Sequence, residues 1–428
     1  MKSRPVIVDG LRTPFAKAGT NLAELAADEL GRVAVNALLT RTGLDPRLVD
    51  EVIFGCVAQP PDAANVARVI ALRAGIPKET PAFTVHRNCA SGCEAITQAC
   101  DKIAAGRGEI YVVGGVESMS QIPLLFCYAA AKKFSAVARA RSARQKLAAL
   151  AAFRPADFFP RAGLKLGLTD PVCGLNMGET AELLAREWNI SREEEDAFAL
   201  QSHRRALFAS GLLSEEICPV YLNRGSKSKL VTADNGPRPG QSLEALAKLQ
   251  PVFEKTTGVV TAGNSSQITD GAAALLVMTE KRASDLGMQP LGVVTGYEYA
   301  GCDPARMGLG PVYAIAKAEE ALGLGLKDAD LVEINEAFAA QVLAVLRAMK
   351  SEKFCRKNLR REQPLGEIPG DKLNVNGGAI ALGHPVGATG ARLVLTALKE
   401  LGRRKGRRAL VSVCVGGGQG AALWLERL

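Results

Sequence analysis

One cysteine lies where nucleophilic chemistry is possible. Cys89 stands within residues 87–93, at the point where a predicted strand gives way to a helix. The unpaired N–H groups and the positive end of the helix dipole at such a position favour the thiolate and are expected to lower the pKa of Cys89. The same N–H groups can stabilise a developing oxyanion. For Cys89 alone, a buried structural thiol is the competing interpretation.

The chain has three histidines, so few side chains can act as the base. His86 precedes Cys89 by three residues on the incoming strand, which places it on the opposite face and roughly 10 Å away. His203 lies in a predicted helix beside two arginines and is expected to be a solvated surface residue. His384 follows a glycine-rich run and precedes Pro385, so its ring is expected at a loop tip before a helix. A structural and a functional role are both open for it.

Two further loops could take part in catalysis. Cys414 and Gly416 end a predicted strand in a glycine-rich loop, where the backbone can approach a ligand closely. A dinucleotide-binding turn does not fit, because only eight residues follow Gly420, too few for the required helix and strand. Asn335 opens a helix after a buried strand, where it could cap that helix or hold a water over a reacting carbonyl. The cysteines lack a second ligand pair with zinc-like spacing, so no metal is expected.

The elements that must position these residues alternate short β-branched runs with longer helical patterns, which is typical of an α/β fold. The two ends of the chain resemble each other in outline, which indicates a duplicated half with reactive residues at equivalent strand-to-helix turns. Strands are predicted at 6–8, 52–54, 110–113, 275–278, 293–295, 331–334 and 410–415, and helices at 22–41, 90–105, 312–322, 337–349 and 388–401.

Composition excludes several classes of protein. The chain has 428 residues, 47% hydrophobic and 23% charged, which excludes disorder and coiled-coil arrays. It contains ten scattered cysteines, which do not form a disulfide framework. No apolar stretch is long enough to span a membrane, and residues 1–4 lead into a short strand, so a cytoplasmic protein, or an organelle protein that is already processed, is expected. Residues 132–165 hold nine basic side chains against one acid, so they carry most of the net charge of +9. The remainder is close to neutral, which argues against a nucleic-acid-binding protein.

The reactive loops together resemble the thiolase family in order and spacing. Residues 260–266 also resemble the family's pantetheine-binding loop, and the resemblance extends from about Val6 to Trp424. It implies duplicated βαβαβαββ halves that form a layered α/β/α/β/α core, with an inserted, mainly helical loop domain. The implied N-terminal half comprises residues 1–120 and 251–289, the loop domain 121–250 and the C-terminal half 290–428. The matching loops are Cys89-Ala90-Ser91, Asn335-Glu336-Ala337-Phe338, Gly383-His384-Pro385 and Cys414-Val415-Gly416.

The resemblance implies roles for the loop residues in cleaving a 3-ketoacyl-CoA. Cys89 would attack C3 and become acylated, His384 would take its proton, and Cys414 would protonate the departing enolate. The N–H groups of Cys89 and Gly416 would hold the C3 oxygen, while His384 and a water on Asn335 would hold the thioester oxygen. The products would be acetyl-CoA and a shortened acyl-CoA. No cofactor would be bound permanently, and coenzyme A would be a co-substrate.

Family positions also carry over to residues that would bind the substrate. Apolar lining falls on Met177, Phe253, Met307 and Phe338, a pantetheine contact on Ser266 and a CoA phosphate contact on Arg238. A homodimer or a dimer of such dimers is expected from the family.

Residues 132–165 resemble the helical hairpin of the β subunit of the fatty-acid β-oxidation trifunctional complex. Their basic and apolar side chains suit an amphipathic helix on an anionic membrane. Contact with a hydratase/dehydrogenase α subunit, or a basic patch that faces CoA, are the other interpretations. For function, the alternatives are an acetoacetyl-CoA-forming thiolase that condenses two acetyl-CoA and, more remotely, an inactive acyl-CoA- or lipid-binding homologue.

Overall fold

The computed structural model describes residues 4–223 and 228–428. Two short segments lie outside the described residues. They are residues 1–3, which precede the first predicted strand, and residues 224–227, which belong to the predicted insertion. The first half of the chain follows the order βαβαβαββ, interrupted by a long insertion before the last strand. Its elements are β1 (Pro5–Arg12), β2 (Ala16–Lys17), α1 (Ala27–Thr42), β3 (Glu51–Gly55), α2 (Val66–Arg73), β4 (Ala82–Val85), α3 (Ser91–Ala104), β5 (Ile110–Ser118), β10 (Thr269–Thr279) and α11 (Glu280–Asp285).

The second half has a similar order. The strand equivalent to β4 is missing among the described residues of this half, and a single parallel bridge between Val332 and Leu373 lies at its position. Its elements are β11 (Gly292–Gly301), the 3-10 helix η5 (Pro304–Leu309), α12 (Gly310–Leu322), β12 (Leu331–Ile334), α13 (Ala339–Lys350), α14 (Glu352–Leu359), α15 (Ala379–Leu382), α16 (Val386–Arg404), β13 (Arg408–Val415) and β14 (Gln419–Arg427).

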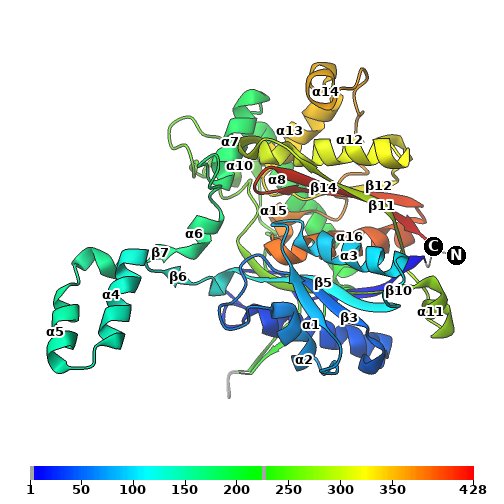
Figure 1. The fold of residues 1–428 in the computed structure, drawn as a ribbon. Coiled ribbons are helices and arrows are strands. Elements are labelled where there is room, and N and C mark those ends of the chain that lie inside the picture. The colour runs from blue at the N-terminus through cyan, green and yellow to red at the C-terminus, as the bar shows by residue number, and fades with distance from the viewer. Residues whose placement is uncertain (1–3, 224–227) are drawn as a thin grey trace.

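The strands join in one mixed sheet of order β12-β13-β14-β11-β1-β10-β5-β3-β4, and β1 meets β11 where Ile7 pairs with Gly292. Helices α1 and α2 pack on the outer face of the first half, and α12 and α13 on the outer face of the second. Helices α3 and α16 lie between the two halves and contact strands of both (Figure 1). This arrangement confirms the α/β fold with alternating helical and strand layers.

Two predicted helices begin later than expected, for local reasons. Residues 21–24 form turns, in which Ala23 N–H donates to the carbonyl oxygen of Thr20 and Leu25 N–H to that of Leu22. Helix α1 begins only at Ala27, followed by two acids in its first turn that complement the helix dipole. Helix α13 begins at Ala339 and not at 337, because Phe338 is extended (φ −145°) and pairs with Ser265 of another loop.

The insertion is mainly helical, as predicted, and Ser191 and Glu194 form a capping box at the start of one of its helices. Its most prominent part is a hairpin of α4 and α5 that projects from the body on a stalk formed by β6 and β7 (Figure 1). Within the described ranges, no helix has both the length and the apolar character required to cross a bilayer. The elements are β6 (Leu124–Leu125), α4 (Tyr128–Arg139), α5 (Ala143–Ala151), β7 (Arg161–Ala162), α6 (Gly163–Gly167), α7 (Met177–Glu187), α8 (Arg192–Phe208), α9 (Ser210–Ser214), β8 (Val220–Leu222), β9 (Lys229–Val231) and α10 (Leu243–Ala247).

Candidate active site

The N-termini of α3 and α16 meet between the two halves, and this places the Cys89 loop beside the His384 loop. Glycine makes the close approach possible: a Cβ at Gly92 would lie 2.6 Å from the backbone nitrogen of Ala391 and 2.9 Å from the carbonyl oxygen of Gly387. Two strand-to-helix turns that are far apart in the sequence therefore come together at one point of the core.

Two backbone N–H groups, that of Cys89 itself and that of Gly416, are directed at the Cys89 sulfur and favour its thiolate form. These hydrogen bonds lower the pKa of Cys89, as expected for a helix N-terminus, but burial has the larger and opposite effect. The pKa of Cys89 is therefore raised, and the expectation of a lowered value is wrong. The free protein holds Cys89 as a thiol, so the thiol needs a base to lose its proton.

His384 is held in a single orientation by its surroundings. Its ring Nδ1 lies 2.6 Å from Thr389 Oγ1, and that hydroxyl in turn donates to the carbonyl oxygen of Pro385 at 3.0 Å. Thr389 therefore accepts a hydrogen bond from Nδ1–H, which leaves Nε2 unprotonated. The backbone N–H of His384 donates to Thr269 Oγ1 at 3.1 Å. Gly383 before it has φ +102°, a conformation that L-residues with a side chain rarely adopt.

The free Nε2 of His384 faces Asn335, whose Nδ2 lies 3.4 Å away. Burial, together with the positive charge of Arg392, lowers the pKa of His384 to about 3, so the ring is neutral at pH 7. The Oδ1 atom of Asn335 is buried and has no hydrogen-bond partner among the residues that the structure describes. A buried carbonyl oxygen of this kind needs a donor from a water or a ligand, which fits the expectation that Asn335 holds a water.

Strand pairing brings Asn335 next to Cys414. Strands β12 and β13 run parallel with Ile334 opposite Ser412, and the N–H of Asn335 donates to the carbonyl oxygen of Ser412 at 2.9 Å. Cys414 is buried, and both burial and the nearby Cys89 thiol raise its pKa well above the ordinary value. A thiol that keeps its proton at neutral pH is suited to act as an acid.

The predicted apolar lining gathers around Cys414. Met177, Met307 and Phe338 pack in one cluster with its side chain, and the rings of Phe253 and Phe338 lie 6.4 Å apart. The predicted pantetheine contact Ser266 lies alongside, since its N–H donates to the carbonyl oxygen of Ala337 at 2.9 Å. These five residues form one wall beside the two cysteines.

Arg238 is exposed on the surface, and its backbone N–H is hydrogen-bonded to the side chain of His203. The prediction of a solvated His203 is wrong, because its side chain is only 2% exposed. It lies on the same face of α8 as Ala199 and Ala206, both buried, and this helical spacing was the signal that its charged neighbours obscured. His203 Nδ1 accepts from the N–H of Arg238 at 3.3 Å, and burial together with Arg238 lowers the pKa of His203 to about 4. His86, by contrast, is exposed.

Sequence reasoning missed Glu117, which braces the loop after His384. Its buried carboxylate accepts hydrogen bonds from the N–H groups of Gly387 at 2.9 Å, Ala58 at 2.8 Å and Val57 at 3.1 Å. It therefore connects the start of α16 to the first half of the chain. The available signal was an acid near the end of β5, a strand whose nine residues are all buried.

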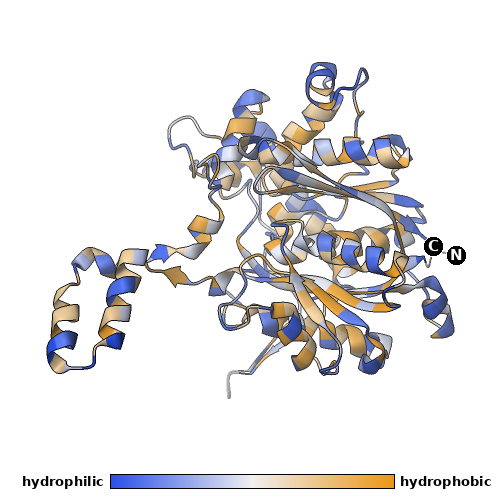
Figure 2. Cartoon of the chain, in the orientation of Figure 1, coloured by the Kyte–Doolittle hydropathy of each residue, from blue (hydrophilic) through white to orange (hydrophobic). Residues whose placement is uncertain are grey.

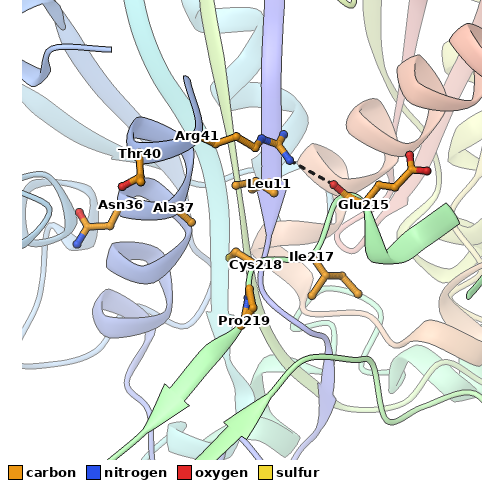
Figure 3. Close-up of a pocket in the computed structure, with 9 residues that line it drawn as sticks. All are labelled: Leu11, Asn36, Ala37, Thr40, Arg41, Glu215, Ile217, Cys218 and Pro219. Carbon is orange, nitrogen blue, oxygen red and sulfur yellow. Dashed lines mark hydrogen bonds between the residues drawn. The ribbon is translucent and has the colours of Figure 1, made fainter. Parts of the chain in front are cut away.

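A pocket of about 450 Å³ lies elsewhere, between α1, β1 and the segment before β8 (Figure 3). Arg41 crosses its rim and donates to the carbonyl oxygen of Glu215 at 3.2 Å. None of the residues that line it is a predicted site residue, and the guanidinium of Arg41 is already paired with Asp9. The chemistry of the reactive loops is therefore separate from this pocket.

Family models match nearly the whole chain. The model for the thiolase N-terminal domain matches residues 5–281, and that for the thiolase C-terminal domain matches residues 288–427. Among curated relatives, a 3-ketoacyl-CoA thiolase of Serratia proteamaculans is 42% identical over 426 residues, 99% of this chain and 97% of that protein. A 3-ketoacyl-CoA thiolase of Yersinia enterocolitica is 41% identical over 426 residues, which are 99% of this chain and 97% of that protein.

Solved structures agree with the sequence relatives. An acetyl-CoA acetyltransferase of Bacillus anthracis has a TM-score of 0.87 at 39% identity and covers 100% of this chain and 99% of that one. Human mitochondrial 3-ketoacyl-CoA thiolase in complex with CoA has a TM-score of 0.85 at 39% identity, covering 100% and 98%. Because both domain models match, relatives are about 40% identical over the full length, and the fold is shared, this chain belongs to the thiolase family.

Proposed function

We propose that this protein cleaves 3-ketoacyl-CoA with free coenzyme A, giving acetyl-CoA and an acyl-CoA shortened by two carbons. The observation that carries the proposal is the meeting of two thiols from opposite ends of the chain, with Gly416 N–H directed at Cys89 and a neutral His384 beside Asn335. The named relatives that match at full length act in the same class.

In the first half-reaction, the Cys89 sulfur attacks C3 of the substrate while Nε2 of His384 takes the thiol proton. The C3 oxygen gains the negative charge and accepts hydrogen bonds from the N–H groups of Cys89 and Gly416. Because the free protein favours the neutral thiol and imidazole, this proton moves only as the carbonyl becomes available to take the charge.

Cleavage of the C2–C3 bond then leaves an acyl group on Cys89 and an enolate of acetyl-CoA. The imidazolium of His384 and a water held by Asn335 stabilise the enolate oxygen, and Cys414 gives its proton to C2. In the second half-reaction, the Cys414 thiolate removes the proton from the CoA thiol. The CoA sulfur attacks the acyl-enzyme, and Cys89 leaves and regains the proton from His384.

The same groups can run the reaction backward as a condensation of two acetyl-CoA, so the residues do not set its direction. We favour cleavage because curated full-length relatives carry the name 3-ketoacyl-CoA thiolase. The test is a series of 3-ketoacyl-CoAs from about four to sixteen carbons, followed by loss of the enolate absorbance on addition of CoA. Rapid cleavage of the longer members supports degradation. Turnover confined to acetoacetyl-CoA would favour the condensing thiolase, and no turnover would favour a binding protein.

We also propose that the α4–α5 hairpin contacts an anionic membrane surface. Eight of the nine basic residues between 132 and 165 are exposed, whereas Lys133 is paired with the single acid, Asp157. Large apolar side chains are exposed beside them, among them Leu147 at 71% and Phe159 at 76%. Figure 2 shows these hydrophilic and hydrophobic residues interleaved along the hairpin. Basic and apolar groups on one projecting element are what an anionic lipid surface binds.

Vesicle co-sedimentation, with and without an anionic phospholipid, tests this contact. Neutralising five hairpin residues should reduce binding at least tenfold, since each basic side chain contributes about 1 kcal/mol at such a surface. Turnover of short substrates should not change. Unaltered vesicle binding, or loss of a co-purifying hydratase/dehydrogenase subunit instead, would contradict it. The five residues changed to Gln are Lys132, Arg139, Arg141, Arg144 and Lys146, and the control set on the body is Lys78, Lys281, Lys327, Lys353 and Lys357.

We further propose a homodimer as the smallest assembly. Strand β4 ends the sheet at one edge, and its four residues are only half-buried. Unpaired edges of this kind are usually covered in folded proteins. Sedimentation equilibrium distinguishes a dimer or a dimer of dimers from the monomer, which would contradict the proposal.

A further inference from the structure

Asn88, the residue before the nucleophile, has an unusual backbone conformation that the surrounding loop enforces. Its φ is +42°, in the left-handed region that few residues other than glycine and asparagine adopt. The turn is held by Ser91, whose Oγ donates to the carbonyl oxygen of Asn88 at 2.7 Å and accepts from the N–H of Arg87 at 2.9 Å. The direction of the Asn88 side chain is therefore set by the same turn that presents Cys89.

The side chain of Asn88 reaches across to the loop at the other end of the chain. Its Nδ2 donates to the carbonyl oxygen of Gly416 at 2.7 Å. Gly416 begins a run of three glycines, and the next two have φ of +86° and +78°. Such a run has high conformational freedom, so its geometry depends on partners outside the loop. Asn88 provides such a partner at the residue whose N–H is directed at the thiol.

A second, independent connection joins Arg87, one residue before Asn88, to Gln419, three residues after Gly416. The guanidinium of Arg87 donates to Glu94 at 2.6 Å and to the side chain of Gln419 at 3.3 Å, and it stacks 4.0 Å from the ring centre of Tyr299. This contact sets the distance between the two loops but does not touch Gly416. Asn88 is the side chain that holds the carbonyl of Gly416, while the next N–H, that of Gly417, is directed at Asp170 and the carbonyl oxygen of Gly418 accepts from the N–H of Cys302 at 2.7 Å.

We propose that Asn88 is a positioning residue that fixes the N–H of Gly416 relative to the N–H of Cys89, so that both reach one oxyanion. The inference rests on the proposed function, because it concerns the two donors of that reaction. Asn88 acts through Gly416 and does not touch the reacting atoms. Losing one oxyanion donor outright costs about 10²–10³ in rate. If the Gly416 carbonyl loses its hydrogen bond to Asn88, the Gly416 N–H is displaced but not removed. We expect this displacement to cost less, about 10- to 100-fold in kcat.

The test removes the side chain without adding backbone strain. Glycine accepts a positive φ freely, so Asn88→Gly loses the hydrogen bond and little else. We expect kcat to fall about 10- to 100-fold with KM within about threefold. We also expect the pH midpoint of Cys89 alkylation by iodoacetamide, followed by peptide mass spectrometry, to move upward, because Gly416 N–H then stabilises the thiolate less well.

Asn189→Gly is the matched control, because Asn189 also has a positive φ, +50°, and lies at the end of α7, away from the reactive loops. It should leave kcat and the alkylation midpoint unchanged. If Asn88→Gly does not fold, Asn88→Ser serves, since its hydroxyl is too short to reach Gly416. A wild-type kcat in either Asn88 variant, or a reduced kcat with an unmoved midpoint, would overturn the proposal. Alkylation of Cys89 does not require thiolase turnover. The alkylation midpoint therefore tests the role of Asn88 even if the proposed function is wrong.

Discussion

Removing the hydroxyl of Thr389 tests whether His384 acts as the base in the tautomer described above. Thr389→Val keeps the shape of the side chain but leaves Nδ1–H of His384 without its acceptor at 2.6 Å. The neutral ring can relax by moving its proton to Nε2. The imidazolium formed during attack carries both protons and cannot relax in this way. Loss of this hydrogen bond therefore destabilises the transition state more than the free protein.

The size of the effect follows from the cost of a buried donor without a partner, about 1–3 kcal/mol. Since each 1.36 kcal/mol is a factor of ten in rate, kcat should fall by about 5- to 160-fold. The assay is cleavage of acetoacetyl-CoA by CoA, with KM measured at the same time. KM should change little, because Thr389 is buried behind the ring and does not line the wall of the site.

Two variants control for stability and chemistry. Thr389→Ser keeps the hydroxyl and should restore most of the activity. Thr396→Val, on the same helix α16, removes a buried hydroxyl that donates to Glu216 at 3.0 Å and should lower the melting temperature without a comparable loss of kcat. If Thr389→Val turned over at the wild-type rate, the tautomer and the basic role of His384 would both be refuted.

Substitutions of Cys89, Cys414 and His203 test the remaining assignments. Cys89→Ala should abolish the acyl-enzyme seen by intact mass spectrometry after mixing with substrate; an adduct of the same mass on the variant would place the nucleophile elsewhere. Cys414→Ala should slow cleavage by at least about 100-fold, the lower end of what a positioned acid provides, while Cys89 still reacts with an acyl donor; equal loss of both would assign Cys414 another role. His203→Asn should flatten the pH dependence of stability. The folded pKa of His203 is about 4, against an ordinary 6.5, so the unfolded chain binds one more proton between these values. Wild-type stability must then fall with falling pH in that window, by up to about 1.4 kcal/mol per unit from this group. Urea denaturation at several pH values measures the difference, and parallel curves for the two proteins would contradict it.

Much of the fold could be predicted from local pattern alone. The short apolar runs around Val112, Leu276 and Val413 are strands, and the longer apolar patterns between such strands form helices as expected. Boundaries failed where a distant partner decided them. Phe338 is extended and not helical because it pairs with Ser265, more than seventy residues away, and no local propensity contains that contact.

The ionisation states required the assembled core. Position before a helix predicted a lowered pKa for Cys89, but the surrounding protein excludes enough water to reverse the sign. The same effect explains the error at His203, whose charged neighbours along α8 suggested a surface that the packing of α8 removes. Burial depends on what covers a residue, and that is a property of the whole fold.

The amino-acid sequence already contains the groups needed for the chemistry: two thiols, one imidazole in a glycine-rich loop, and an amide after a strand. Their order and spacing also indicated the family. How these groups meet depends on the folded chain, because Cys89 and Gly416 lie on two loops that are more than three hundred residues apart in the sequence. Contacts such as that of Asn88 with Gly416 arise from packing between the halves, and no spacing along the chain contains them.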